Sequence, residues 1–156
     1  MLLARRPQPV TAVDGSGVAL DLLVERARAE NLAVYRTNDH EIFAETRNHH
    51  VRLVQADLER TSLPVESFAL ILCIQYLQRS LHPQIERALF PGGMLVFETY
   101  TRAQLDFAGG PRNPAFLLEP GELRDAFPLL EVLFYSELWA GQGIASLVAQ
   151  KSSAGK

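Results

Sequence analysis

The sequence contains little that could cross-link the chain. There is 1 cysteine among 156 residues, so no internal disulfide can form. This residue, Cys73, lies in the apolar run of residues 70–74, where we expect it to be a small buried hydrophobic residue. A single unpaired cysteine fits a reducing compartment, and we therefore expect a cytoplasmic protein.

Long apolar runs and an excess of positive charge are also missing. No stretch approaches the roughly 18 consecutive apolar residues of a membrane helix, and residues 1–7 have no apolar core of the kind that a signal peptide needs. The formal charge is −3 at pH 7, which argues against a partner held mainly by neutralising phosphates. We expect neither a membrane nor a nucleic acid as a partner.

What the sequence does contain is typical of a globular protein with a buried core. Hydrophobic residues make up 47% of the chain and charged residues 21%, which are ordinary values for such a protein. The length suits one domain, which we place over residues 1–151. Residues 152–156 are small and polar, and we expect them to form a disordered tail.

Hydrophobic periodicity predicts strands that alternate with helices. The strands are expected at residues 10–13, 51–56, 68–74, 94–99, 130–138 and 144–150, and the helices at 18–30, 76–89 and 119–127. The second helix contains Pro83, which we expect to interrupt it. Residues 68–74 are almost wholly apolar, as in a strand buried on both faces.

This order indicates an α/β fold. Alternation of strands and helices is typical of a Rossmann-like, mostly parallel sheet, and the short turn at residues 139–143 makes the last two strands an antiparallel hairpin. Residues 31–50 are the least readable stretch, and we interpret them as an insertion or a partly ordered loop. Within it, a short strand is possible at 32–35 and a helical turn at 42–44.

Two acids follow successive predicted strands, and both strands end at them. Ligands of open α/β sheets bind beyond the carboxyl ends of the strands. Asp14 is placed to accept hydrogen bonds from both hydroxyls of a ribose, and Asp57 to accept one from an adenine amino group. Either acid alone is explained better as the cap of a turn or helix. The pair, in this order, favours a nucleotide site.

Two other patterns offer competing interpretations. Gly15-Ser16-Gly17 resembles the start of a phosphate-binding turn, which would indicate a fragment of a nicotinamide-dependent dehydrogenase. The third glycine of that motif would fall at Leu20, however, and a lone pair of glycines is a weak signal. The residues His40, His49 and His50 have neither helical spacing nor a cysteine partner, so a solvated loop is favoured over a metal site.

Several segments together resemble the class I S-adenosylmethionine (SAM) dependent methyltransferases. Residues 9–16 resemble the second strand and acidic loop of that family, residues 54–58 its adenine-side motif, and residues 68–72 its fourth strand. Residues 89–99 are similar to the L-x-PGG-x-L entry to the fifth strand, which is the most specific single match. Residues 112–123 are similar to a signature of the tellurite-resistance-type branch.

The sequence departs from that family at two points. Ala69 replaces the acid usual in the fourth strand. The first strand, whose acid-x-Gly-x-Gly-x-Gly loop wraps the methionine part of SAM, has no counterpart, because only eight residues precede Pro9. The resemblance thus implies a domain truncated at its N-terminus, in which the second and fourth strands have open edges. These two strands pair with each other, or the chain borrows a strand from another copy and forms a homodimer, or it is only marginally folded.

The resemblance implies a SAM site and an acceptor site. The SAM site would comprise Asp14, Gly15, Ser16, Asp57, Leu58, Cys73 and Ile74. The acceptor side would comprise Gln75, Tyr76, Tyr100, Arg112 and Asn113, although packing explains both tyrosines equally well, and turn chemistry explains Arg112 and Asn113.

The expected function is methyl transfer from SAM to a small molecule, impaired by loss of the glycine loop. SAM is already an activated methyl donor, so in-line transfer mainly needs positioning and exclusion of water. For that reason no catalytic residue is assigned. The alternative is an inactive Rossmann-like remnant or a binding module.

Overall fold

The computed structural model describes residues 9–37 and 51–153. The described residues form two compact units, which divide between Ser62 and Leu63. The expectation of one domain over residues 1–151 stays a prediction. The possible helical turn at 42–44 and the end of the predicted tail, residues 154–156, lie outside the described residues.

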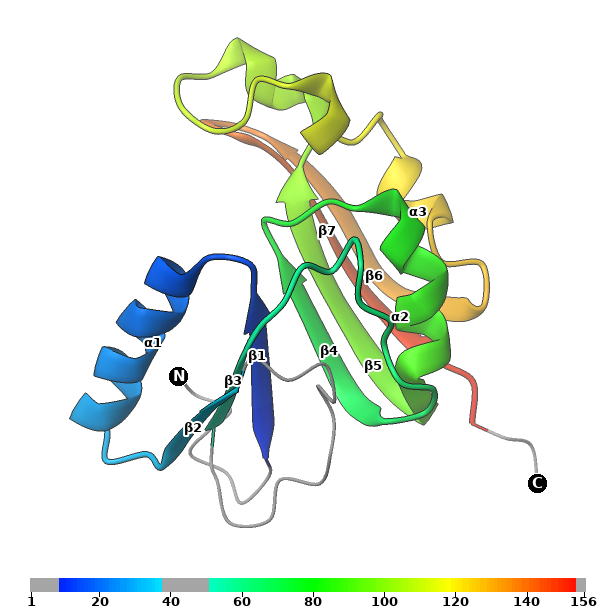
Figure 1. The fold of residues 1–156 in the computed structure, drawn as a ribbon. Helices are drawn as coiled ribbons and strands as arrows, with labels where there is room; N and C mark the ends of the chain where they lie inside the picture. Colours follow the sequence, from blue (N-terminus) through cyan, green and yellow to red (C-terminus); the bar gives the residue numbers. More distant parts are fainter. Residues whose placement is uncertain (1–8, 38–50, 154–156) are drawn as a thin grey trace. The chain divides into compact units, whose positions relative to one another are not determined.

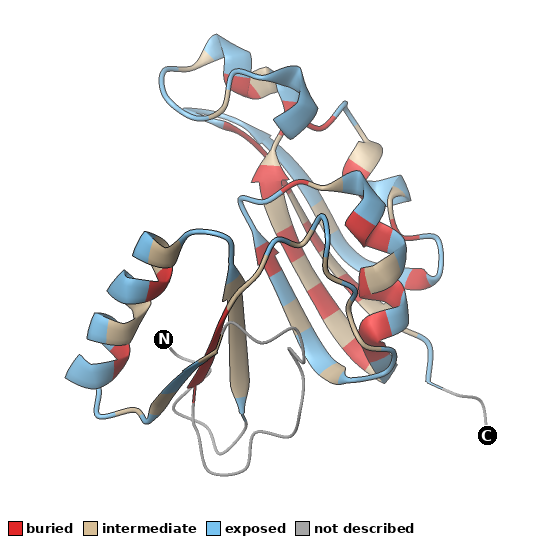
Figure 2. Ribbon diagram, in the orientation of Figure 1, coloured by how far each residue is buried: buried red, intermediate tan, exposed pale blue. Residues whose placement is uncertain are grey.

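The first unit is a small parallel sheet with one helix. Its elements are β1 (Val10–Asp14), α1 (Gly17–Ala29), β2 (Val34–Thr37) and β3 (Val51–Gln55). The strand order is β1-β3-β2, and both pairings are parallel. One side of α1 carries its buried residues (Figure 2), and Leu20 from this side packs with Val51 and Leu53 of β3. This apolar contact stabilises the unit.

Local sequence determines where α1 begins. Ser16 has extended backbone angles, and its Oγ accepts a hydrogen bond from the N–H of Ala19 at 3.3 Å. A serine in this position satisfies one of the backbone donors that the first turn of a helix leaves unpaired. Arg26 and Arg28 lie in the last turn, where positive charge complements the helix dipole. The predicted helix is therefore confirmed, and the possible strand at 32–35 is β2, displaced by two residues.

The second unit is a mixed sheet with two helices and three 3₁₀ turns. Its strands are β4 (Phe68–Ile74), β5 (Leu89–Tyr100), β6 (Leu130–Trp139) and β7 (Gly143–Lys151); its helices are α2 (His82–Ala88) and α3 (Glu122–Asp125). The strand order is β4-β5-β7-β6 (Figure 1). The short turns are Arg79–Leu81, Arg102–Asp106 and Pro114–Phe116.

Strand directions confirm the predicted fold class. β4 is parallel to β5, whereas β7 is antiparallel to both of its neighbours. The C-terminal hairpin is therefore formed by β6 and β7, as the short turn between them predicts. The hydrogen bonds divide the strands between two sheets, so β1 pairs with β3 and β4 with β5. The pairing of β1 with β4 that the sequence left open stays a prediction.

A cluster of three rings forms the centre of the second unit's core. The ring of His82 lies 5.7 Å from that of Phe97 and 4.9 Å from that of Phe127, measured between centroids. Burial lowers the pKa of His82, so the imidazole is neutral in this core at pH 7. Pro83 lies in the first turn of α2, where its missing N–H costs nothing. It is the second residue of α2, so the helix predicted at 76–89 is confirmed as an α-helix only over His82–Ala88, after a 3₁₀ turn at Arg79–Leu81.

The expected burial of β4 on both faces is also wrong. Leu70, Leu72 and Ile74 are 38%, 48% and 52% exposed, whereas Cys73 on the opposite face is buried. An apolar run alone does not distinguish a central strand from an edge strand, since both can carry it. β4 lies at one end of its sheet, and β1 lies at one end of the other. Each of these two strands is thus an edge strand of its own unit, and the open edges that the resemblance implied stay a prediction for the whole chain.

Candidate functional site

The two acids singled out from the sequence lie at the same edge of one sheet. β1 and β3 are adjacent and parallel, with Asp14 opposite Gln55. Asp57 follows Gln55 by two residues, and the N–H of Ala56 donates to the carbonyl oxygen of Asp14 at 3.3 Å. Both acids are exposed. The register therefore places both acids beyond the carboxyl ends of neighbouring parallel strands, where ligands of such sheets bind.

Each carboxylate is oriented by a nearby backbone N–H. Oδ1 of Asp14 accepts from the N–H of Ser16 at 2.7 Å, and Oδ1 of Asp57 accepts from the N–H of Glu59 at 2.9 Å. These are turn-capping bonds of the kind that aspartates commonly make. They occupy one oxygen of each acid, and the other has no hydrogen-bond partner among the described residues. Capping and ligand binding are therefore compatible here.

A polar network that sequence reasoning missed supports this edge. The side-chain amide of Gln55 donates to the carbonyl oxygen of Gly15 at 3.3 Å, and Arg36 donates to Oε1 of Gln55 at 3.2 Å. Arg36 also forms an ion pair with Asp21 of α1. The network connects β2, β3, α1 and the turn after β1. Gln55 could have been identified from the sequence, because it lies near the end of a predicted strand, two residues before Asp57. Arg36 could not, because the sequence of residues 31–50 indicates no clear secondary structure.

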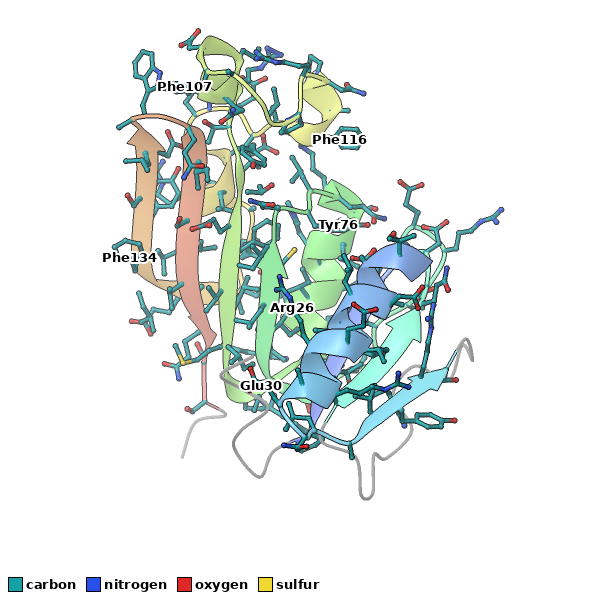
Figure 3. The ribbon with its side chains drawn as sticks, turned by 90° about the vertical axis from the view of Figure 1, so that its left-hand side faces the viewer. Arg26, Glu30, Tyr76, Phe107, Phe116 and Phe134 are labelled. Atoms are coloured by element: carbon teal, nitrogen blue, oxygen red, sulfur yellow. The ribbon has the colours of Figure 1, made fainter. Side chains whose placement is uncertain are left out.

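In the second unit, Gln75 and Tyr100 come together at the ends of β4 and β5. The N–H of Gln75 donates to the carbonyl oxygen of Glu98 at 2.7 Å, and its side-chain amide donates to the hydroxyl of Tyr100 at 3.3 Å. Gln75 has φ +54°, a left-handed conformation that costs a non-glycine residue of order 1 kcal/mol and is concentrated at functional sites. Tyr76 follows it (Figure 3) and donates to Gln78.

The other two predicted acceptor-side residues make contacts within the loop between β5 and α3. The guanidinium of Arg112 donates to the carbonyl oxygens of Leu105 and Phe107 at 2.8 and 2.5 Å. The side chain of Asn113 accepts from the N–H of Ala115 at 3.0 Å and caps a 3₁₀ turn. These bonds support the shape of the loop, and a role for either residue toward an acceptor stays a prediction.

Cys73 and Ile74 point to opposite faces of β4. Ile74 is 52% exposed and Cys73 only 9%. The thiol lies 3.7 Å from the carbonyl oxygen of Tyr76, and burial raises the pKa of Cys73 to about 12. A thiol in this state is inert, because the thiolate is the reactive form. The predicted buried cysteine is confirmed.

The folded protein should therefore resist thiol reagents. At pH 8, a rise in the Cys73 pKa from 9.0 to about 12 lowers the thiolate fraction about a thousandfold. We expect the reaction of Cys73 with a maleimide or Ellman's reagent to be slower than in urea-unfolded protein by at least this factor. Equal rates in the two states would show that β4 does not shield the thiol.

A surface hollow of about 530 Å³ lies between α1 and β2. Asp21 and Arg36 line part of it, but Asp14 and Asp57 do not.

Among the described residues, no three histidine, cysteine, aspartate or glutamate side chains gather as metal ligands. The residues His40, His49 and His50 lie outside the described part of the chain. No helix in the described part of the chain has the length and apolarity to cross a membrane.

Solved structures share this arrangement of strands and helices. The [4+2]-cyclase SpnF aligns with 98% of this chain at 17% identity and a TM-score of 0.69, and the chain covers 69% of SpnF. TehB from Haemophilus influenzae aligns with 96% of this chain at 15% identity and a TM-score of 0.69. A SAM-dependent methyltransferase from Methanosarcina mazei aligns with 97% of this chain at 16% identity and a TM-score of 0.64. The fold is that of SAM-dependent methyltransferases.

Sequence comparison adds no closer relationship. No family model matches the chain, and no curated protein matches it at a significant level. The chain spans 52% of the length of TehB and 86% of that of the Methanosarcina mazei methyltransferase. At these identities the likeness establishes the methyltransferase fold alone, so the activity has to be argued from the site.

Proposed function

We propose that the chain is a SAM-dependent methyltransferase, or the remainder of one, that acts on a small molecule. The observation that carries this proposal is the register of β1 against β3, which places Asp14 and Asp57 side by side at the carboxyl edge of a parallel sheet. One oxygen of each acid has no partner among the described residues, which fits the hydroxyl and amino donors of an adenosine. The methyltransferase fold supports the same assignment.

The resemblance alone gives the proposed roles, residue by residue. Asp14 would accept from the ribose hydroxyls beside Gly15 and Ser16, while Asp57 and Leu58 would hold the adenine. Cys73 and Ile74 would lie on the methyl side of SAM. Gln75, Tyr76 and Tyr100 would orient an acceptor, with Arg112 and Asn113 further along the chain. SAM supplies the activated methyl group, and the protein supplies orientation and exclusion of water.

Binding is proposed to be weak. The adenosine half of SAM fits the acidic edge, but the 156 residues contain no acid-x-Gly-x-Gly-x-Gly loop for the methionine half. Backbone N–H groups of such a loop would otherwise receive the carboxylate of that half. We therefore propose impaired activity, and the similarity of residues 112–123 to the tellurite-resistance-type branch is part of the same proposal.

Calorimetric titration with S-adenosylhomocysteine tests the proposed function. We expect measurable heat at millimolar ligand, and a loss in affinity of about tenfold or more in Asp14→Asn, because a hydrogen bond to a charged group contributes roughly 1.5–3 kcal/mol. Asp57→Asn should weaken binding in the same direction. Asp106→Asn is the matched control, since Asp106 is also an exposed aspartate but lies in a 3₁₀ turn of the other unit.

Two outcomes would count against the proposal. A cooperatively folded protein that gives no heat at millimolar S-adenosylhomocysteine would favour the inactive remnant. Binding of NAD in place of S-adenosylhomocysteine would favour a dehydrogenase fragment built around Gly15-Ser16-Gly17.

A further inference from the structure

The open edge of β4 differs from the other sheet edges of the described residues. β1, β2 and β6 are the other edge strands. β2 is short, with four residues, and includes the charged Arg36. β6 carries Glu131 and Glu137, and its pairing with β7 is irregular. β1 has five residues and ends at the charged Asp14. Charges, bulges and short length are the features that protect an edge from pairing. β4 has seven residues, and the segment 67–78 around it has no charge.

The backbone of β4 leaves an ordered row of donors and acceptors at this edge. In a parallel strand, each residue directs its N–H and C=O to one side and the next residue directs them to the other. The N–H of Gln75 donates to Glu98 of the β5 side, so the N–H and C=O groups of Leu70, Leu72 and Ile74 point to the open side. No strand of the described second unit pairs with them.

The same three residues also expose their side chains. Leu70, Leu72 and Ile74 alternate along β4 and therefore share one face of the sheet, and each is more than a third exposed. A partner strand laid along this edge would thus gain backbone hydrogen bonds and apolar contacts from the same residues. The partner strand has to be apolar and uncharged to match them.

We propose that the occupant of this edge is β4 of a second copy of the chain. Two copies related by a twofold axis through Leu72 pair antiparallel, so that Leu72 lies opposite the partner's Leu72 and Leu70 opposite the partner's Ile74. In this register every outward-facing residue of β4 meets another outward-facing residue, and each such pair exchanges both backbone hydrogen bonds.

Self-complementarity favours a second copy over an unrelated strand. A twofold interface uses the same patch on both subunits, and β4 fulfils the requirements of such a patch: no charge meets a like charge, and leucine and isoleucine side chains face each other as favourable cross-strand pairs. Twofold closure also uses up the edge, which prevents further growth of the sheet. This inference does not depend on SAM binding.

Charged substitutions of Leu72, which faces the partner's Leu72 at the centre of the proposed interface, test the proposal. We expect the wild-type chain to sediment as a dimer at micromolar concentration. Leu72→Lys alone and Leu72→Glu alone should be monomeric, with dissociation constants raised about tenfold or more, because like charges directly opposite in a sheet destabilise pairing. An equimolar mixture of the two variants should restore the dimer. Restoration also shows that both variants are folded.

Leu133→Lys is the matched control. Leu133 is a strand leucine that is 49% exposed, against 48% for Leu72, but it lies on β6. This variant should remain dimeric. A wild-type chain that stays monomeric at hundreds of micromolar, a mixture that does not reassociate, or dissociation of Leu133→Lys would each overturn the proposal. Because S-adenosylhomocysteine takes no part in these measurements, their failure is distinct from failure of the proposed function.

Discussion

Replacing Gly143 by alanine should strongly destabilise the second unit. Gly143 begins β7, and a Cβ at this position would lie 2.2 Å from the backbone nitrogen of Gln104 and 2.5 Å from the carbonyl carbon of Ala103. Both atoms belong to the backbone, so no side-chain rotation relieves the clash. Gly143 also donates to Oε1 of Gln104 at 2.9 Å, and any displacement of the strand breaks this buried hydrogen bond.

We expect Gly143→Ala to lower the free energy of unfolding by about 3 kcal/mol or more, the upper range for overpacking with backbone shifts. A single domain typically has only about 5–15 kcal/mol in all. Urea unfolding followed by circular dichroism measures the loss. Gly15→Ala is the control, because its Cβ would meet only the carbonyl oxygen of Ala56 at 3.8 Å. A loss below about 1 kcal/mol in Gly143→Ala would contradict the tight approach of β7 to this turn.

Replacing Phe97 by alanine should also greatly lower the free energy of unfolding. Phe97 is 1% exposed and packs its ring against those of His82 and Phe127. Truncation to alanine leaves a cavity in the centre of the core, and such changes cost about 3–5 kcal/mol. The cavity would lie beside a buried imidazole whose Nε2 has no hydrogen-bond partner among the described residues.

Phe134→Ala provides the matched control. Phe134 lies on β6, is 53% exposed and points away from the sheet (Figure 3), so its removal should change the free energy of unfolding by less than about 0.5 kcal/mol. The two variants differ in burial and not in chemistry. Equal losses in both, measured by urea unfolding, would show that the ring cluster is not the centre of this core.

Much of the local structure could be predicted because its causes are local. Ser16 caps α1 through a hydrogen bond three residues away, and short apolar runs mark the strands whichever partner they take. The acids Asp14 and Asp57 could be proposed as neighbours because parallel strands that end at acids bring their carboxyl ends to one edge. The register of β1 against β3 confirms that placement.

The site beyond these two acids could be predicted only in part. Gln75 and Tyr100 were expected on one side of the site, and a hydrogen bond joins them. The role of Arg36 could not be predicted from the sequence, because it depends on Asp21 and Gln55. These residues are distant along the chain and contact Arg36 only in the folded protein.

Neighbouring residues are enough to specify the strands, the capped helix, the C-terminal hairpin and the acid at the end of each of two strands. Contacts between distant segments were needed to show that β4 is the edge strand of its sheet with Leu72 exposed, and that α2 begins only at His82. An apolar strand offers the same pattern whether one or both of its sides are paired. Only the presence or absence of a neighbouring strand distinguishes these cases, and such a neighbour is distant in the chain.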